Sequence, residues 1–301
     1  GLQFKADLFL SEGRGGRKLL SASQVHGGRT AYVSHGTFDQ AYRLFARPDL
    51  LRRVSRFHPR AIAQAFLARR DFRRDRNDMH GAKWVVAVSP FVAESVRSTY
   101  GVAADRVRII GNGVTVPARL PSQATARKRV GMGQGTWLLF LGRLEPVKGV
   151  LDLVKAVQSQ PDLNLLVAGT GPEERTLSAI AQTDPGLRER VRFLGRVSDE
   201  KKWDCYVASD FFVLPSKSEG EPISILEALG VGRPVVTTQD WVAPGLRDGC
   251  VIDPDVGDGI RTALDSKLRI EKIARRVREE HTWESVAEHY LSLGEAPTSG
   301  R

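Results

Sequence analysis

The chain of 301 residues is poor in cysteine and methionine and has no long apolar run. Its two cysteines, Cys205 and Cys250, form neither a disulfide framework nor a metal-binding or redox motif, which favours a reducing compartment. Apolar runs such as Trp84–Val88 and Trp137–Leu141 have the length of strands and are too short to span a membrane. No secretory signal is visible among the first residues. These absences predict a cytoplasmic protein.

Charge is unevenly distributed along the chain. Residues 1–116 carry 20 Lys and Arg against 9 Asp and Glu, whereas residues 117–301 carry 25 against 26. Most of the excess lies in Arg43–Arg76, where eleven arginines face three aspartates. Such asymmetry indicates an anionic partner. Three interpretations stay open: a membrane surface with which the protein associates, a phosphorylated acceptor, or solvated arginine-rich helices. Nucleic acid is not expected, because no recognised DNA-binding motif is present.

Short β-rich runs alternate with helical patterns, which predicts an α/β protein with parallel, doubly wound sheets. The predicted strands are Ala6–Leu10, Thr30–Ser34, Trp84–Val88, Val107–Ile110, Trp137–Leu141, Leu163–Ala168, Val191–Leu194, Asp210–Leu214, Val235–Thr238 and Cys250–Ile252. The predicted helices lie within Phe38–Asn77, interrupted at Pro48 and Pro59 but including Arg60–Phe72, and at Asp152–Gln160, Pro172–Thr183, Lys267–Glu280 and Trp283–Leu293.

The stretch from residue 117 to residue 135 contains proline, serine and glycine and predicts an interdomain linker with a short basic helix. It would join an N-terminal, acceptor-side domain of residues 1–116 to a nucleotide-binding domain of residues 136–281. Residues 282–301 are predicted to form a terminal helix that packs back toward the first domain.

The most informative stretch is Ser216–Val236, which indicates a strand end, a polar loop, a short helix and a turn into another strand. A helix beginning near Pro222 would leave the first backbone amides, those of Ile223, Ser224 and Ile225, without helical partners. Two carboxylates, Glu219 and Glu227, lie eight positions apart, one in the loop and one on the helix. Free amides and a helix dipole suit phosphate, and carboxylates suit hydroxyl groups, so the stretch predicts a sugar-diphosphate site.

This spacing resembles the E-x7-E signature of the retaining glycosyltransferases of family 4, and further motifs follow in the order found in that family. They are Ile109-Ile-Gly-Asn-Gly-Val114, Gly142-Arg-Leu-Glu-Pro-Val-Lys-Gly149, Leu165-Leu-Val-Ala-Gly-Thr-Gly-Pro172, Phe193-Leu-Gly-Arg-Val197 and the terminal His281-Thr-Trp-Glu-Ser-Val-Ala-Glu-His-Tyr290. The resemblance implies the GT-B fold, in which two Rossmann-like domains face a cleft.

The resemblance also implies an enzyme that transfers a hexosyl group from a nucleotide diphosphate sugar to an acceptor, with retention at the anomeric carbon and without a metal or other cofactor. The acceptor would be a lipid, a sugar or a small molecule. The residues carried over as catalytic are His35, Glu219, Arg143 and Lys148, and those carried over as donor-binding are Gly142, Arg143, Lys148, Gly169, Val197, Glu219, Gly220, Ile223, Ser224, Ile225 and Glu227.

Within that set, Arg143 and Lys148 would neutralise the departing diphosphate, because preorganised cations stabilise developing negative charge. Glu227 would accept hydrogen bonds from the ribose, and Glu219 and His35 would position the donor sugar. Asp253-Pro-Asp255 has the D-x-D form of metal-dependent transferases, but it falls where the family has a turn, so no metal site is expected.

The first domain departs from the family pattern, because the opening βα units have no counterpart before Lys5–Glu12. The sheet would then expose an edge along Ala6–Leu10, which native proteins usually cover or pair. A homo- or hetero-oligomer could cover that edge. Two further interpretations therefore stay open beside the transferase: a donor-binding subunit or fragment that needs a partner chain to be active, and a nucleotide-sugar epimerase of similar fold, against which the combined motifs argue.

Overall fold

The computed structural model describes residues 8–12, 29–34 and 59–295, with side chains placed for most of them. Contacts divide these residues into two units. One unit combines the described residues up to Asn112 with those from Val286 onward, and the other spans Gly113–Ser285. Residues 117–135, the predicted linker, lie within the second unit.

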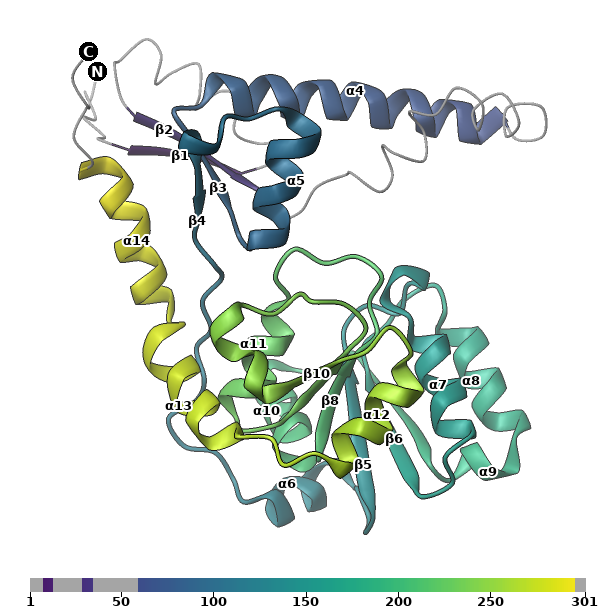
Figure 1. Cartoon of the computed structure of the whole chain (residues 1–301). Helices are drawn as coiled ribbons and strands as arrows, with labels where there is room; N and C mark the ends of the chain where they lie inside the picture. Colours follow the sequence, from purple (N-terminus) through teal and green to yellow (C-terminus); the bar gives the residue numbers. More distant parts are fainter. Residues whose placement is uncertain (1–7, 13–28, 35–58, 296–301) are drawn as a thin grey trace. The chain divides into compact units, whose positions relative to one another are not determined.

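The first unit is built on a four-stranded sheet in the order β1-β2-β3-β4, with all neighbouring strands parallel (Figure 1). Its elements are β1 (Leu8–Glu12), β2 (Arg29–Ser34), α4 (Pro59–Gly81), β3 (Trp84–Ala87), α5 (Pro90–Tyr100), η2 (Ala104–Arg106) and β4 (Val107–Ile109). The strand β1 lies at one edge of the sheet within the described residues. No described helix is both long and apolar enough to cross a membrane.

Local sequence explains how the elements of this unit begin and end. Strand β3 is a continuous apolar run, and Val85, Val86 and Ala87 are fully buried, as expected for a parallel strand covered on both faces. Helix α5 begins where the Ser89 hydroxyl accepts a hydrogen bond from the Val92 amide at 3.2 Å, and it ends at Gly101, whose φ is 69°.

The terminal helix α14 (Trp283–Glu295) packs on this same sheet. Its residues Val286, Tyr290 and Leu293 recur at helical spacing, and they join Val86 and Ile110 in one hydrophobic cluster. This spacing explains why the last helix joins the four-stranded sheet, although most of the sheet comes from the beginning of the chain.

The second unit holds a six-stranded parallel sheet in the order β10-β9-β8-β5-β6-β7. Its strands are β5 (Thr136–Leu141), β6 (Leu163–Ala168), β7 (Val191–Gly195), β8 (Phe211–Leu214), β9 (Val235–Thr237) and β10 (Cys250–Ile252). Its helices are α6 (Gln123–Val130), η3 (Pro146–Lys148), α7 (Val150–Gln158), α8 (Glu174–Thr183), α9 (Pro185–Arg188), α10 (Asp199–Ala208), α11 (Ile223–Gly230), η4 (Pro244–Gly249), α12 (Val256–Asp265) and α13 (Ile270–Glu280).

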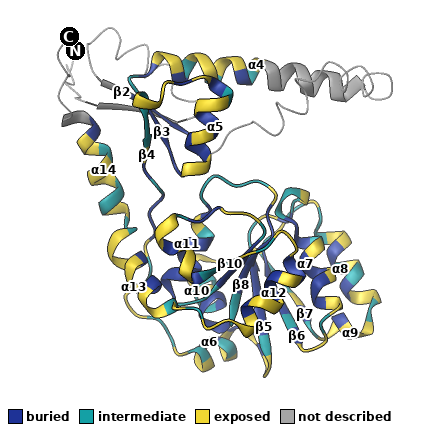
Figure 2. Cartoon of the chain, viewed as in Figure 1, coloured by how far each residue is buried: buried dark blue, intermediate teal, exposed yellow. Residues whose placement is uncertain are grey.

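The strand order reverses direction between β5 and β8. From β5 the chain moves outward to β6 and β7, and it then returns to β8 on the other side of β5. Because parallel crossovers are right-handed, the crossover helices of the two halves cover opposite faces of the sheet, whereas α12, which follows the last strand, contacts α7. The four central strands β5, β6, β8 and β9 are mostly buried (Figure 2). In doubly wound sheets ligands bind beside the carboxyl ends of the strands at this reversal, so a ligand is expected beside the loops after β5 and β8.

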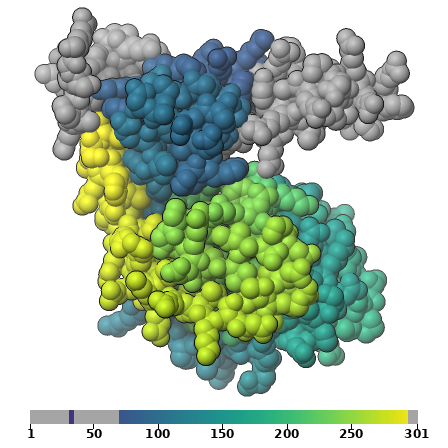
Figure 3. Space-filling view, viewed as in Figure 1, coloured from purple at the N-terminus to yellow at the C-terminus, as the bar shows by residue number. Residues whose placement is uncertain are grey.

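On the surface of this unit the later segments gather on one face, where α11 and α13 contact each other, while α7, α8 and α9 form its flank (Figure 3).

Most predicted strands agree with the structure to within two residues, including β6 and β10 at their predicted bounds. Helix α4 begins at Pro59, in agreement with the predicted break there, since proline suits a first turn. The strand predicted at Ala6–Leu10 is described from Leu8 onward as β1. Helices α5, α10 and α12 were not predicted.

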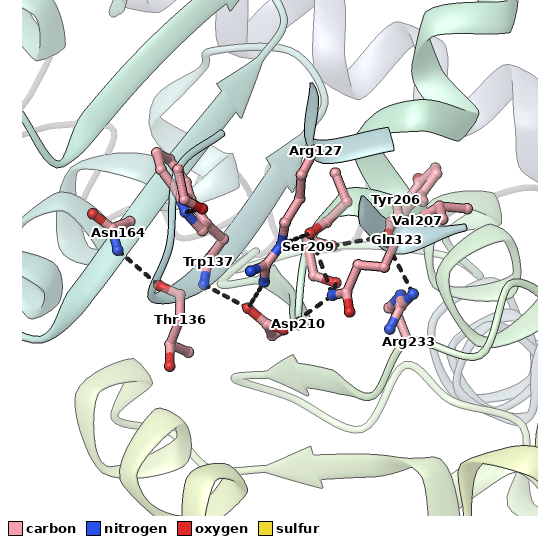
Figure 4. Close-up of polar contacts among 12 residues, drawn as sticks. Gln123, Arg127, Thr136, Trp137, Asn164, Tyr206, Val207, Ser209, Asp210 and Arg233 are labelled. Carbon is pink, nitrogen blue, oxygen red and sulfur yellow. Dashed lines mark hydrogen bonds and ion pairs between the residues drawn. The ribbon is translucent and has the colours of Figure 1, made fainter. Parts of the chain in front are cut away.

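At the amino-terminal ends of the strands of the six-stranded sheet, α6 is attached by a polar cluster (Figure 4). The carboxylate of Asp210 accepts hydrogen bonds from Arg127 at 2.6 Å, from Gln123 at 3.1 Å and from the backbone amide of Trp137 at 2.8 Å. Arg127 also donates to the Ala208 carbonyl at 3.0 Å. The cluster therefore joins α6 to the beginnings of β5 and β8.

Two arginines on α6 provide a matched test of this attachment. Replacing Arg127 with alanine is expected to lower the free energy of unfolding by about 2–3 kcal/mol, because its side chain is only 20% exposed and donates both to the Asp210 carboxylate and to the Ala208 carbonyl. Replacing Arg129, whose exposed side chain pairs with Asp204 at 3.2 Å, should cost less than about 1 kcal/mol. Urea denaturation followed by circular dichroism measures both. Equal losses would show that the cluster stabilises the fold no more than the exposed ion pair does.

Candidate functional site

The loops that follow β5, β6 and β8 are hydrogen-bonded to one another at the carboxyl edge of the six-stranded sheet. The amide of Gly142 donates to the Ala168 carbonyl at 3.0 Å, and that of Leu144 donates to the Thr170 carbonyl at 2.9 Å. The amide of Lys217 donates to the Val147 carbonyl at 2.8 Å. These bonds fix the loop of Gly142–Gly149 between its two neighbours at the point where the strand order reverses.

Glycines allow these loops to approach so closely. Gly169 has a φ of 144°, and a Cβ there would lie 1.8 Å from the carbonyl oxygen of Gly142. Gly149 has a φ of 70°, and a Cβ there would lie 2.2 Å from the carbonyl oxygen of Pro215. Both positions therefore exclude every residue with a side chain. The glycines of the two loop motifs thus have a packing role, whatever they contact in a ligand.

The structure brings together two residues that the sequence predicted separately. The ammonium of Lys148, at the end of η3, donates to Oε1 of Glu219, in the loop after β8, at 2.5 Å. The side chains are 19% and 12% exposed, so the pair is shielded from most solvent. A partly buried pair of this kind holds both charges in fixed positions, with two further ammonium protons directed elsewhere.

Arg143 is placed differently from Lys148. Its Nη1 donates to Oε1 of Glu145 at 2.7 Å, but its side chain is 73% exposed. A surface ion pair contributes little stability and is easily rearranged. The two predicted cations therefore differ in exposure and restraint: Lys148 is held in place, whereas Arg143 lies on the surface of the loop.

Helix α11 begins at Ile223, near Pro222 as predicted, and Pro222 is its N-cap residue. One detail of the prediction was wrong, because the amide of Ile225 donates to the Pro222 carbonyl at 3.0 Å and is already used within the first turn. The amides of Ile223 and Ser224 precede it at the helix start, where an α-helix offers no earlier acceptor. The predicted set of three amides is thus reduced to two.

Glu227, on the second turn of α11, is only 8% exposed. Its Oε1 accepts from the ammonium of Lys202 at 2.7 Å, and its Oε2 accepts from the hydroxyl of Tyr206 at 2.8 Å. Burial, and then the charge of Glu227, raises the pKa of Tyr206 well above its usual value, so the phenol stays protonated and donates. Sequence analysis missed Lys202 and Tyr206, although their spacing of four places both on one face of α10.

The remaining predicted residues are spread around these loops. Val197 follows β7 and is half-buried, and Gly220 lies in the loop between Glu219 and Pro222. His35 and residues 43–58 fall outside the described residues. The arginines of α4 with placed side chains are exposed, namely Arg70, Arg73, Arg74 and Arg76. An anionic surface as partner of this segment stays a prediction.

The aspartates of the D-x-D sequence are used locally. Asp253 accepts from the amide of Asp255 at 2.9 Å, and Asp255 caps α12 by accepting from the amide of Asp258 at 2.9 Å. Within the described parts of the chain, no three His, Cys, Asp or Glu side chains are grouped so that they could hold a metal ion. Both cysteines are free, and burial raises the pKa of each thiol to about 12.

A cavity of about 810 Å³ lies elsewhere on this unit, between α7, α12 and the loops after β8, β9 and β10. Asp152, Lys217, Gln239 and Arg261 are among its lining residues. Of the predicted donor-binding residues that the structure describes, none lines it. The cavity therefore shares the loop after β8 with the candidate site, but it is not lined by the predicted site residues.

Known protein families match both parts of the chain. Residues 123–279, more than half of the chain, match the family described as Glycosyl transferases group 1, and residues 4–116 match the one described as Glycosyltransferase Family 4. The chain belongs to the group 1 glycosyl transferases. The predicted family is thus confirmed.

Relatives with curated names agree with this assignment. The chain is 35% identical over 202 residues to a D-inositol 3-phosphate glycosyltransferase of Mycobacterium sp. strain JLS, which covers 63% of this chain and 46% of the relative. It is 28% identical over 244 residues to mannosylfructose-phosphate synthase of Agrobacterium fabrum, covering 71% of this chain and 53% of that protein. The chain therefore spans about half the length of these relatives.

Solved structures confirm the fold class. Sucrose-phosphate synthase from Thermosynechococcus elongatus superposes with a TM-score of 0.75 at 20% identity, covering 96% of this chain and 73% of that one. Anabaena HepE, solved in complex with UDP-glucose, gives a TM-score of 0.70 at 18% identity and covers 96% of this chain and 79% of its own. Two parallel α/β sheets and these likenesses establish the GT-B fold of this group 1 member.

Proposed function

We propose that the chain is a glycosyltransferase that moves a hexosyl group from a nucleotide diphosphate sugar to an acceptor hydroxyl, with retention at the anomeric carbon and without a metal ion. The observation that carries this proposal is the Lys148–Glu219 pair, held at the strand reversal beside the start of α11. Family membership and the UDP-glucose held by HepE support it.

In this proposal the leaving nucleoside diphosphate is bound by Lys148, by Arg143 and by the amides at the start of α11. Lys148 can keep its bond to Glu219 and direct its other protons to phosphate oxygens, since an ammonium has three donors. Arg143 can turn from Glu145 to the diphosphate at little cost, because its side chain is exposed. These charges stabilise the transition state, in which the diphosphate gains negative charge.

The chemical step would take place on one face of the sugar. The bond from the anomeric carbon to the diphosphate oxygen breaks as the acceptor oxygen approaches from the same side, and the acceptor proton passes to the leaving phosphate. Glu219 and His35 position the sugar, and Glu227 binds the ribose. None of these assignments requires a covalent intermediate on the protein, which is why retention is proposed with attack on the same face.

A narrower role also fits one observation. A donor-binding subunit or fragment that needs a partner chain for turnover stays the second candidate, and the β1 edge of the four-stranded sheet is the observation that favours it. A second chain that pairs with the β1 edge in an oligomer could be that partner. The acceptor class stays open between a lipid, a sugar and a small molecule.

Slow transfer to water tests the proposal without knowledge of the acceptor. UDP-, GDP- and ADP-hexoses are titrated into the chain in the presence of EDTA, and the released sugar is followed by proton NMR. One donor is expected to bind and to release a sugar with the anomeric configuration of the donor. Binding without release would favour the donor-binding role, inversion would refute retention, and dependence on added metal would refute metal independence.

A further inference from the structure

Three side chains from neighbouring helices form a buried polar unit beside the proposed donor site. Glu227 comes from α11, and Lys202 and Tyr206 come from α10. Tyr206 is fully buried, Glu227 is 8% exposed and the Lys202 side chain is 21% exposed. A carboxylate this deeply buried is stable as an anion only when paired and hydrogen-bonded, and these two donors supply both.

The two donors engage different oxygens of the carboxylate. Tyr206 binds Oε2 and Lys202 binds Oε1, so the plane of the carboxyl group is held at both ends. A carboxylate offers about four lone-pair directions, and two of them are used here. The remaining directions are fixed in space, which is what recognition of two adjacent hydroxyl groups requires.

The donors are themselves held in place. The ring of Tyr206 packs against Phe212 at a centroid distance of 5.5 Å and against Trp203 at 6.0 Å. The ammonium of Lys202 lies 4.9 Å from the centre of the Trp203 ring and 3.7 Å from Asp199. Neither donor can move away without breaking further contacts, so the carboxylate direction is set by the packing of α10 on the sheet.

We propose that Tyr206 and Lys202 are positioning residues that orient Glu227 for the ribose hydroxyls of the donor nucleotide. This proposal rests on the proposed function. It differs from a merely structural role in one respect: loss of either donor should matter only to a ligand that carries the hydroxyl groups which Glu227 binds.

The test measures binding by calorimetry, with whichever of UDP, GDP and ADP binds the wild-type chain and with its 2′,3′-dideoxy counterpart. Tyr206→Phe and Lys202→Met are each expected to weaken binding of the ribonucleotide about tenfold. They should change binding of the dideoxynucleotide by less than about twofold, since that ligand lacks the hydroxyls. Lys201→Met is the matched control, because Lys201 is the exposed neighbour on the same helix, and it should change neither affinity.

A second comparison uses Glu227→Gln, which alone is expected to weaken ribonucleotide binding. Adding Tyr206→Phe or Lys202→Met to this variant should then have no further effect, because all three act through one carboxylate. Additive losses would overturn the proposal. If thermal unfolding shows that Tyr206→Phe does not fold, the same measurements are made with Lys202→Met alone, because the Lys202 side chain is partly exposed and its replacement is better tolerated.

The outcomes separate this proposal from the proposed function. Equal weakening of both nucleotides, or no weakening of either, would refute the positioning role while leaving donor binding intact. Equal affinity of the wild-type chain for both nucleotides would refute ribose recognition by Glu227. Absence of binding by any nucleotide to the wild-type chain would overturn the proposed function, and this inference with it.

Discussion

Replacing Lys148 with methionine is expected to weaken binding of the donor diphosphate by roughly ten- to hundredfold, because one charge-assisted hydrogen bond is worth about 1.5–3 kcal/mol. The effect should be larger than that of Arg143→Ala. Lys148 is held by Glu219 at 2.5 Å and is largely shielded, whereas the Arg143 side chain is 73% exposed. Calorimetric titration with the nucleoside diphosphate that binds the wild-type chain measures both changes.

The substitution has a second consequence that a further variant separates. Without Lys148, the Glu219 side chain loses its cationic partner and leaves an uncompensated acidic group beside the proposed phosphate site. The double variant Lys148→Met with Glu219→Gln removes that acidic group and should recover stability, but it should not recover full affinity. Complete recovery of binding would show that Lys148 only neutralises Glu219 and does not bind phosphate.

Lys217 provides the control for this experiment. It lies in the loop after β8, and its side chain is 63% exposed, with its ammonium 3.7 Å from Asp152. Lys217→Met removes the same charge from a neighbouring loop and should alter affinity by less than about twofold. A loss as large as that of Lys148→Met would indicate that general positive charge, and not a positioned ammonium, attracts the ligand.

Replacing Gly169 with alanine is expected to lower the free energy of unfolding by about 2–6 kcal/mol, the sum of backbone strain at positive φ and of forced repacking. The added Cβ would lie 1.8 Å from the Gly142 carbonyl oxygen, and a backbone atom cannot yield as a flexible side chain can. The displaced loop also carries Lys148, so nucleotide binding should be lost in the same variant.

Gly133→Ala is the matched control, because a Cβ there meets no atom within 4 Å and the residue is exposed. Its free energy of unfolding should stay within about 0.5 kcal/mol of the wild-type value. Thermal and urea unfolding measure both variants. A Gly169→Ala chain as stable as the Gly133→Ala chain would show that the loops can separate without cost, and would remove the packing explanation for this glycine.

Local patterns in the sequence predicted much of the architecture. Buried parallel strands such as β5 and β6 are mostly apolar runs, which can be recognised within a few residues. Helices α5, α10 and α12 were not predicted, although Ser89, Ser198 and Asp255 cap them. One prediction about backbone amides was wrong, because the amide of Ile225 at the start of α11 is bonded within its own first turn.

For the candidate site, too, some features follow from local sequence and others from tertiary structure. By itself the sequence determined the order of motifs, the family, and the loops in which Lys148, Glu219 and Glu227 stand, because each motif is short and continuous. Only the tertiary structure decided that Lys148 and Glu219, 71 positions apart, form an ion pair, and that Glu227 is held by α10. Those contacts depend on which strands become neighbours, and strand order in a parallel sheet is set by crossovers that no local pattern records.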